Sequence, residues 1–244
     1  MARTLILLLL AALGWAESFS GTITAVESLR GPPETTDREE LERLAATLDA
    51  RIRQHRESLA SAKPLSARIL KEDLGFLQAE QERLVLRGGG ELSLATTMFT
   101  LHQGRLLQVG DDARLQIDRN RNLALADIAG SVRSLALAPL PQPTADAGKP
   151  GPLTLGRETV ERHMVINGRK ATVLAVAGLP NPWALGLLEG TGEGDLLGVL
   201  ATVPGLPVVA TWDDGGLTRE LRVTAITPGP VDERLFIPWP VGTP

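Results

Sequence analysis

The sequence predicts an α+β protein built on a strongly curved antiparallel sheet, an incomplete barrel of about nine strands covered by short helices. Three observations support this prediction: short runs of alternating polarity, turns of two to four residues between them, and a long leucine-rich segment near the N-terminus. Turns this short force neighbouring strands to run antiparallel, because parallel pairing needs a long crossover. A sheet this large usually curls or packs on itself.

The first sixteen residues have the pattern of a secretory signal peptide. Arg3 precedes an apolar run over 5–13, and Gly14 and Ala16 are small residues at the positions that a cleavage after Ala16 requires. The run is shorter than the ~20 apolar residues that cross a bilayer. We therefore expect a periplasmic or secreted protein with no transmembrane span, consisting of a signal peptide (1–16) and one domain (17–244).

Composition narrows the function classes. The formal charge is -4 over 244 residues, which argues against nucleic-acid binding, and only 3% of residues are aromatic, too few for a base-stacking platform. Cysteine is absent, so disulfides, thiolate metal sites and lipid attachment to an N-terminal cysteine are excluded.

A helical hairpin is predicted at 36–87, inserted after a strand at 19–26. Apolar residues recur there at helical spacing in two series that are separated by a break at 61–64. The series are Leu41, Leu44, Leu48, Ile52 and Leu59, then Leu70, Leu74, Leu77 and Leu84. From Glu34 to Arg87 the chain has ten basic and eleven acidic residues, so it has no field that would gather phosphate or anionic lipid. The hairpin is first a structural element, and docking of a protein partner is the alternative.

The rest of the chain is predicted to be mostly strands. The expected strands are 91–101, 105–109, 113–118, 123–128, 132–138, 161–166, 170–177, 208–212 and 217–226. Asn167 and Gly168 form the best short hairpin signal. A proline-rich connector covers 139–152, and short apolar helices begin at Pro182 and after Asp195.

Four short motifs spread along the chain resemble the outer-membrane lipoprotein carrier (LolA-like) superfamily, and most closely its periplasmic domains of unknown function. They are F-S-G-T-I at 19–23, G-R-K-A-T-V-L-A-V at 168–176, G-L-P-V-V at 205–209 and V-D-E-R-L-F-I-P at 231–238. The resemblance implies a half-barrel wrapped around helices, with an apolar cavity that in the carriers receives acyl chains.

The predicted function is therefore an exported cell-envelope protein of binding or carrier type, which holds a lipid acyl chain or another apolar ligand. Concave, mostly apolar pockets suit such ligands. The candidate ligand-binding residues are Met98, Leu115, Trp183, Leu188 and Trp212. The alternative is a non-enzymatic structural or interaction module whose helical hairpin docks a protein partner.

No enzymatic or metal signature stands out. His55, His102 and His163 lack ligand spacing, and no serine lies in a G-x-S-x-G setting. Asp118, Asn120 and Asn122 match the first ligand positions of a calcium loop, but Leu123 stands where that loop needs glycine. We expect no catalytic residues, no metal and no cofactor.

Overall fold

The computed structural model describes residues 19–32, 38–111, 113–144 and 146–239. These residues form two compact units. The sheet unit comprises the described residues of Met1–Glu27, Leu94–Asp213 and Glu220–Pro244, and the hairpin unit those of Ser28–Ser93 and Asp214–Arg219. The predicted signal peptide (1–16) lies outside the described residues, as do the first two positions of the predicted hairpin.

The fold is α+β, with an open, curved antiparallel sheet of eleven strands rather than about nine. Their order across the sheet is β6-β5-β4-β3-β2-β1-β11-β10-β9-β8-β7. The strands are β1 (Gly21–Arg30), β2 (Glu91–His102), β3 (Arg105–Val109), β4 (Ala113–Asp118), β5 (Leu123–Ile128), β6 (Ser131–Leu135), β7 (Lys149–Pro150), β8 (Val160–Ile166), β9 (Arg169–Val176), β10 (Leu206–Asp214) and β11 (Leu217–Pro228). The strand without a sequence signal is β7, two residues inside the proline-rich connector.

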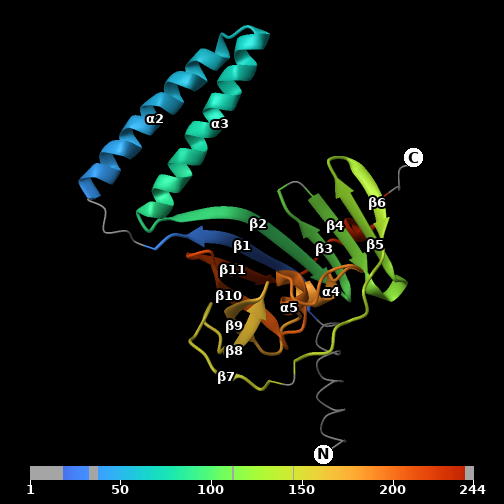
Figure 1. Cartoon of the computed structure of the whole chain (residues 1–244). Helices are drawn as coiled ribbons and strands as arrows, with labels where there is room; N and C mark the ends of the chain where they lie inside the picture. Colours follow the sequence, from blue (N-terminus) through green and yellow to red (C-terminus); the bar gives the residue numbers. More distant parts are fainter. Residues whose placement is uncertain (1–18, 33–37, 112, 145, 240–244) are drawn as a thin grey trace, which may run out of the picture. The chain divides into compact units, whose positions relative to one another are not determined.

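Two-residue turns set the strand order where the sequence predicted them. Asn167 and Gly168 have φ angles of 50° and 76°, and Gln103 and Gly104 have 49° and 74°. Left-handed angles at both central residues are those of the type I′ turn, whose twist matches that of a β-hairpin. Short connections also join β3 to β6, and each of these strands lies next to the one that follows it in the chain (Figure 1).

The predicted helical hairpin is confirmed over the described residues, as α2 (Arg38–Ala60) and α3 (Pro64–Arg87), which run side by side in Figure 1. Its buried seam consists of Leu48, Ile52, Leu77 and Leu84, with Leu41, Ala45 and Leu74 packed against them. The step from Leu41 to Ala45 to Leu48 to Ile52 alternates between four and three residues, as in a coiled coil. Leu44, which we expected in the seam, lies one position off this repeat and is 37% exposed.

Two short apolar helices cover the sheet unit's core, as predicted: α4 (Pro182–Leu185) and α5 (Leu196–Ala201). Asn181 joins them, because its Oδ1 accepts from the backbone N–H groups of Trp183 and Ala184 while its Nδ2 donates to Leu200 O at 2.7 Å. Leu200 is fully buried in the same cluster as Ile23, Val173 and Val208 of the strands. The helices therefore pack onto the sheet through their own apolar side chains.

Two 3-10 turns complete the described chain, η1 (Arg119–Arg121) and η2 (Glu233–Phe236). Phe236 of η2 is buried. Among the described residues, no helix has the length and apolar character needed to cross a bilayer.

Candidate functional site

The structure brings four of the five predicted ligand-binding residues to one core. Trp183 and Trp212 are each 5% exposed and belong to the main apolar cluster, and Leu115 and Leu188 are half-buried against it. Trp183 meets Phe99 edge to face, with ring centroids 5.2 Å apart. Met98 is different: its side chain is 41% exposed, and the buried apolar residues at that end of β2 are Phe99 and Leu101.

The volume beside the two tryptophans is occupied by the protein's own side chains. Leu185 of α4 and Val199 and Leu200 of α5 are buried in the same cluster as both indoles. Close-packed interiors of this kind leave few voids larger than a water molecule. Trp183 and Trp212 thus pack with other buried side chains in one apolar cluster.

The hollows described in the sheet unit lie at its periphery. One, of about 530 Å³, is lined by Leu188, Leu196 and Leu197 together with Asn167, Glu189 and Asp195. Another, of about 170 Å³, lies beside β8 and includes Arg162. Leu188 is the only predicted ligand-binding residue on the lining of either hollow.

The hairpin unit carries the most exposed aromatic side chain among the described phenylalanines and tryptophans. Phe76 of α3 is 76% exposed, and Ile69, seven residues earlier on the same side of the helix, is 55% exposed. Both lie away from the buried seam of Leu74, Leu77 and Leu84. A Cβ added at Gly75 would meet no atom within 4 Å, so the space beside this glycine is open.

Carboxylates surround Phe76. Glu72 and Asp73 precede it by one turn and Glu80 follows it by one turn, and all three are exposed. Arg68 neutralises Glu72 in part, with Nε 3.3 Å from the Glu72 carboxylate. We name the exposed residues Ile69, Glu72, Asp73, Phe76 and Glu80 the α3 patch. Its centre is apolar and the exposed charges within one turn of Phe76 are carboxylates, while exposed Arg83 lies two turns further along on the same side of the helix.

A serine, a histidine and a glutamate that are distant in sequence meet at one end of β2. Ser20 Oγ lies 2.7 Å from His102 Nδ1, and His102 Nε2 lies 3.6 Å from Glu233 Oε1. The imidazole stacks on Phe236, and the Arg105 guanidinium lies 4.9 Å from the centre of the same ring. No spacing in the sequence signals this cluster, since the pairing of β1 with β2 creates it.

The geometry of this cluster is that of a tie between the tail and the sheet. Stacking of His102 on Phe236 and the contact of His102 with Glu233 hold η2 against the end of β2.

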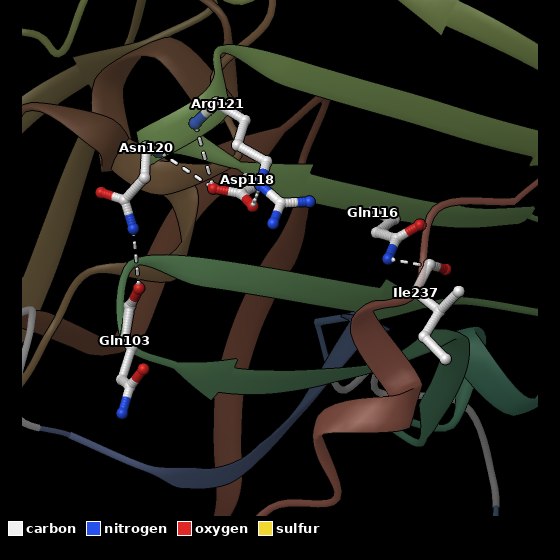
Figure 2. A network of polar contacts seen from close by, with 6 residues as sticks. All are labelled: Gln103, Gln116, Asp118, Asn120, Arg121 and Ile237. Atoms are coloured by element: carbon white, nitrogen blue, oxygen red, sulfur yellow. Dashed lines mark hydrogen bonds and ion pairs between the residues drawn. The ribbon is translucent and has the colours of Figure 1, made fainter.

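The stretch that partly matched a calcium loop is a capped turn (Figure 2). Asp118 Oδ1 accepts from the backbone N–H of Asn120 at 3.0 Å and of Arg121 at 3.2 Å, while Asn120 Nδ2 donates to Gln103 O at 3.2 Å. The carboxylate thus caps η1.

Gln116 of β4 is also drawn in Figure 2. Its side chain is 3% exposed because the C-terminal tail covers it, and its Nε2 donates to Ile237 O at 3.2 Å.

Arg119 is a structural residue that the sequence did not indicate. Its guanidinium donates to Leu185 O at 2.9 Å, Leu187 O at 3.1 Å and Ala184 O at 3.2 Å, and also to Ala138 O. Burial lowers the pKa of Arg119 by desolvating the cation. The residue closes the C-terminal end of α4, whose last carbonyls have no partner within the helix.

Comparisons with known proteins leave the family open. No family model matches the chain, and no curated protein matches it. The chain is similar to a solved structure described as "Structure of PNGF-II in C2 space group", at 13% identity and a TM-score of 0.38. That similarity covers 61% of this chain and 27% of the other, so the chain spans about a quarter of that protein's length.

Proposed function

We propose that this chain is a non-enzymatic interaction module whose helical hairpin docks a protein partner. The observation that carries the proposal is the exposure of Phe76 and Ile69 on α3. Large aromatic side chains are among the residues that dominate binding energy at protein interfaces. The α3 patch is an apolar anchor without a partner in a chain that holds few aromatic residues.

The hairpin's own packing does not require these two residues. The seam of Leu48, Ile52, Leu77 and Leu84 already buries the facing sides of α2 and α3. Anchors at i and i+7 on one helix are the pattern by which an amphipathic helix enters a groove of another protein. Phe76 would enter such a groove first, with Ile69 beside it.

Charge indicates the chemistry of the partner. Glu72, Asp73 and Glu80 surround Phe76, so a complementary groove has an apolar floor and a rim of lysine or arginine. Antiparallel pairing of two copies of α3 about Phe76 would set Glu72 opposite Glu80, and like charges in contact disfavour that arrangement. The expected partner is therefore a different protein.

The exported location and the family are part of the same proposal. The signal-peptide pattern at 1–16 supports a periplasmic or secreted protein, and the motifs at 19–23, 168–176, 205–209 and 231–238 support the lipoprotein-carrier superfamily. N-terminal sequencing of the protein recovered from the cell envelope tests the location. A first residue of Glu17 is the expected result, and an intact Met1 would contradict it.

Site-specific photocrosslinking of the full chain tests the hairpin. A benzoylphenylalanine at position 76 should give a discrete adduct, whereas the same probe at exposed Ala46 on α2 should give none. Substituting Glu72, Asp73 and Glu80 by lysine should abolish the adduct made at position 76, with the circular dichroism spectrum unchanged. Equal adducts at both positions, or an adduct that survives the lysine substitutions, would contradict the proposal.

A second candidate function is the carrier of an apolar ligand. The groove lined by Leu188, Leu196 and Leu197 favours it, since its apolar wall lies next to the main core. Native mass spectrometry of protein purified from the envelope is the test. A retained lipid that is lost in Leu188→Asp but kept in the exposed Leu153→Asp control would support a carrier, and protein free of any apolar ligand would refute it.

A further inference from the structure

The hollow beside β8 adjoins a free strand edge. β7 pairs with β8 only at Lys149–Glu161 and Pro150–Val160. Within the part of the chain that the structure describes, β8 from Arg162 to Ile166 therefore has a neighbouring strand only on the β9 side. His163, Met164 and Val165 of this edge line the hollow of about 170 Å³. Extended backbone at such an edge offers N–H and C=O groups to a ligand.

Two polar side chains of this pocket have buried atoms without a partner. Arg162 is 7% exposed and its Nε donates to Asp146 O at 3.3 Å, but its Nη1 has no hydrogen-bond partner. The Thr144 hydroxyl oxygen is also buried and unpartnered. Buried polar atoms are almost always hydrogen-bonded, so two exceptions in one pocket call for a ligand with acceptor oxygens.

The pocket's charges are mixed. Arg162 supplies a cation at the base, and Asp146 and Glu193 supply exposed carboxylates at the rim. Asp146 Oδ1 accepts from Gly148 N at 2.9 Å, and the backbone oxygen of the same residue accepts from Arg162 Nε at 3.3 Å. Burial lowers the pKa of Arg162 through desolvation, and the negative charge of Asp146 opposes that change. The cation is thus retained in a partly desolvated position.

Charge and size together select one ligand class. The rim carboxylates repel a simple anion, and Arg162 repels a simple cation, whereas a molecule that carries both charges satisfies both. A volume of about 170 Å³ is smaller than the ~300–1,000 Å³ of sites for drug-sized ligands, and corresponds to about five or six water molecules of liquid volume. A small amino acid has this size and this pair of charges.

We propose that this pocket binds a free α-amino acid. Its carboxylate lies on Arg162 and the Thr144 hydroxyl, and its ammonium group faces Asp146 and Glu193. The backbone edge of β8 at His163–Val165 lies alongside it. This site is independent of the docking role proposed for the hairpin, because all of its residues belong to the sheet unit.

Calorimetric titration of the full chain with four probes is the test. Glycine and L-alanine should bind saturably, whereas propionate, which lacks the ammonium group, and L-alanine methyl ester, which lacks the carboxylate, should bind at least about tenfold more weakly. The proposal would be overturned if all four probes bound with equal affinity, or if none of them bound saturably.

Two conservative variants keep the test independent of folding. Thr144→Val and Asp146→Asn change single atoms of the pocket and should each weaken L-alanine binding by about fivefold or more. Arg157→Gln changes a cation of the same unit outside the pocket lining and should leave the affinity unchanged. If Thr144→Val and Asp146→Asn bind L-alanine as tightly as the parent chain, with unfolding midpoints unaltered, the pocket is not the site.

Discussion

The sheet unit and the hairpin unit use apolar residues in opposite ways. The sheet unit buries 24 residues in one cluster, with two tryptophans inside it, whereas the hairpin buries four along a single seam. The hairpin in turn leaves Ile69 and Phe76 exposed on α3. Large apolar side chains are exposed in the sheet unit as well, among them Leu153 at 73% and Ile237 at 62%. A two-helix seam buries only one side of each helix, so the exposed Ile69 and Phe76 lie on one side of α3, where a partner could contact both.

The two units also differ in how their contacts arise. Seam residues of the hairpin lie at helical spacing on two helices joined by a short turn, whereas the sheet unit pairs strands as distant in sequence as β1 and β11. Stability in the sheet unit depends on residues that no local pattern brings together. Substitutions in each unit test this contrast.

Truncation at the centre of the sheet unit should have the largest effect. Trp183→Ala removes an indole that is buried against Phe99, and it should lower the free energy of unfolding by about 3–5 kcal/mol. Urea denaturation followed by circular dichroism measures the change. The exposed Leu153→Ala is the control and should change stability by less than ~0.5 kcal/mol. Similar losses in both variants would show that the cluster is not the main core.

Replacing Arg119, whose guanidinium binds carbonyl oxygens at the end of α4, should cause the second-largest loss of stability. Arg119→Met removes hydrogen bonds to four carbonyl oxygens, of which Leu187 O keeps a second donor in the backbone N–H of Ala138, and should destabilise the chain by about 2–4 kcal/mol. Arg119→Lys should recover only part of this loss, because an ammonium group lacks the planar fork of donors. Arg121→Met, two residues away, loses only a 3.6 Å surface contact with Asp118 and should cost less than ~1 kcal/mol. Chemical denaturation would refute the anchor if the two arginines proved equivalent.

The hairpin seam should respond locally. Leu77→Ala should weaken the seam by about 2–3 kcal/mol, whereas Leu44→Ala, at a partly exposed position off the seam, should cost less than ~1 kcal/mol. Hydrogen exchange resolved by residue should show faster exchange in α2 and α3 and unchanged protection in β8, β9 and β10. Faster exchange in those strands as well would mean that the two units unfold as one.

Alanine substitutions at two glycines should change the free energy of unfolding in opposite directions. Gly75→Ala adds a methyl group to open space inside α3, so it should stabilise the helix by about 0.5–1 kcal/mol. Gly205→Ala in the sheet unit should destabilise by about 1–3 kcal/mol, because its φ is +85° and the new Cβ would lie 2.3 Å from Val176 O. Thermal unfolding of the two variants compares them directly. A loss of stability in Gly75→Ala would show that this glycine has a role in the folded chain.

The smallest effect should come from the exposed pair at η2. Hydrogen bonds from the Arg234 side chain, and then from its backbone, hold the pKa of Asp232 below its usual value of 3.8. The resulting stability is present above the unfolded-state pKa and is lost as the pH falls through the folded-state pKa. Arg234→Ala should raise the pKa of Asp232 only part of the way, since the backbone donor remains. An NMR titration of the Asp232 carboxyl carbon measures this, and an unchanged pKa would contradict the assignment.

Local patterns were sufficient for much of the fold. Leucine spacing predicted α2 and α3, Asn167 with Gly168 predicted the turn between β8 and β9, and Pro182 and Asp195 marked the two short helices. Hydrophobic periodicity and turn residues act over a few neighbouring residues, so both can be recognised in the sequence without the structure. The predicted strand ranges include none for β7, because β7 is two residues long and pairs only with β8.

The candidate sites were far less predictable. Trp183 and Trp212 were expected to border a cavity, and both are buried in one apolar cluster with residues of α5 and of the strands. Met98 and Phe99 are adjacent in sequence, and only the packing of the sheet decides which of them is buried. Ser20, His102 and Glu233 meet through strand order, and Arg162 and Thr144 meet at a strand edge, without any spacing that marks them.

The hairpin, the strand-rich remainder and the lack of thiol groups follow from composition and short-range periodicity, which are visible in the amino-acid sequence alone. The packing of the main apolar cluster, the exposure of Phe76 and the place of Arg162 in a pocket with carboxylates at its rim became known only from the folded chain. Burial depends on the neighbours that a residue acquires on folding, and those neighbours come from segments far apart in the chain.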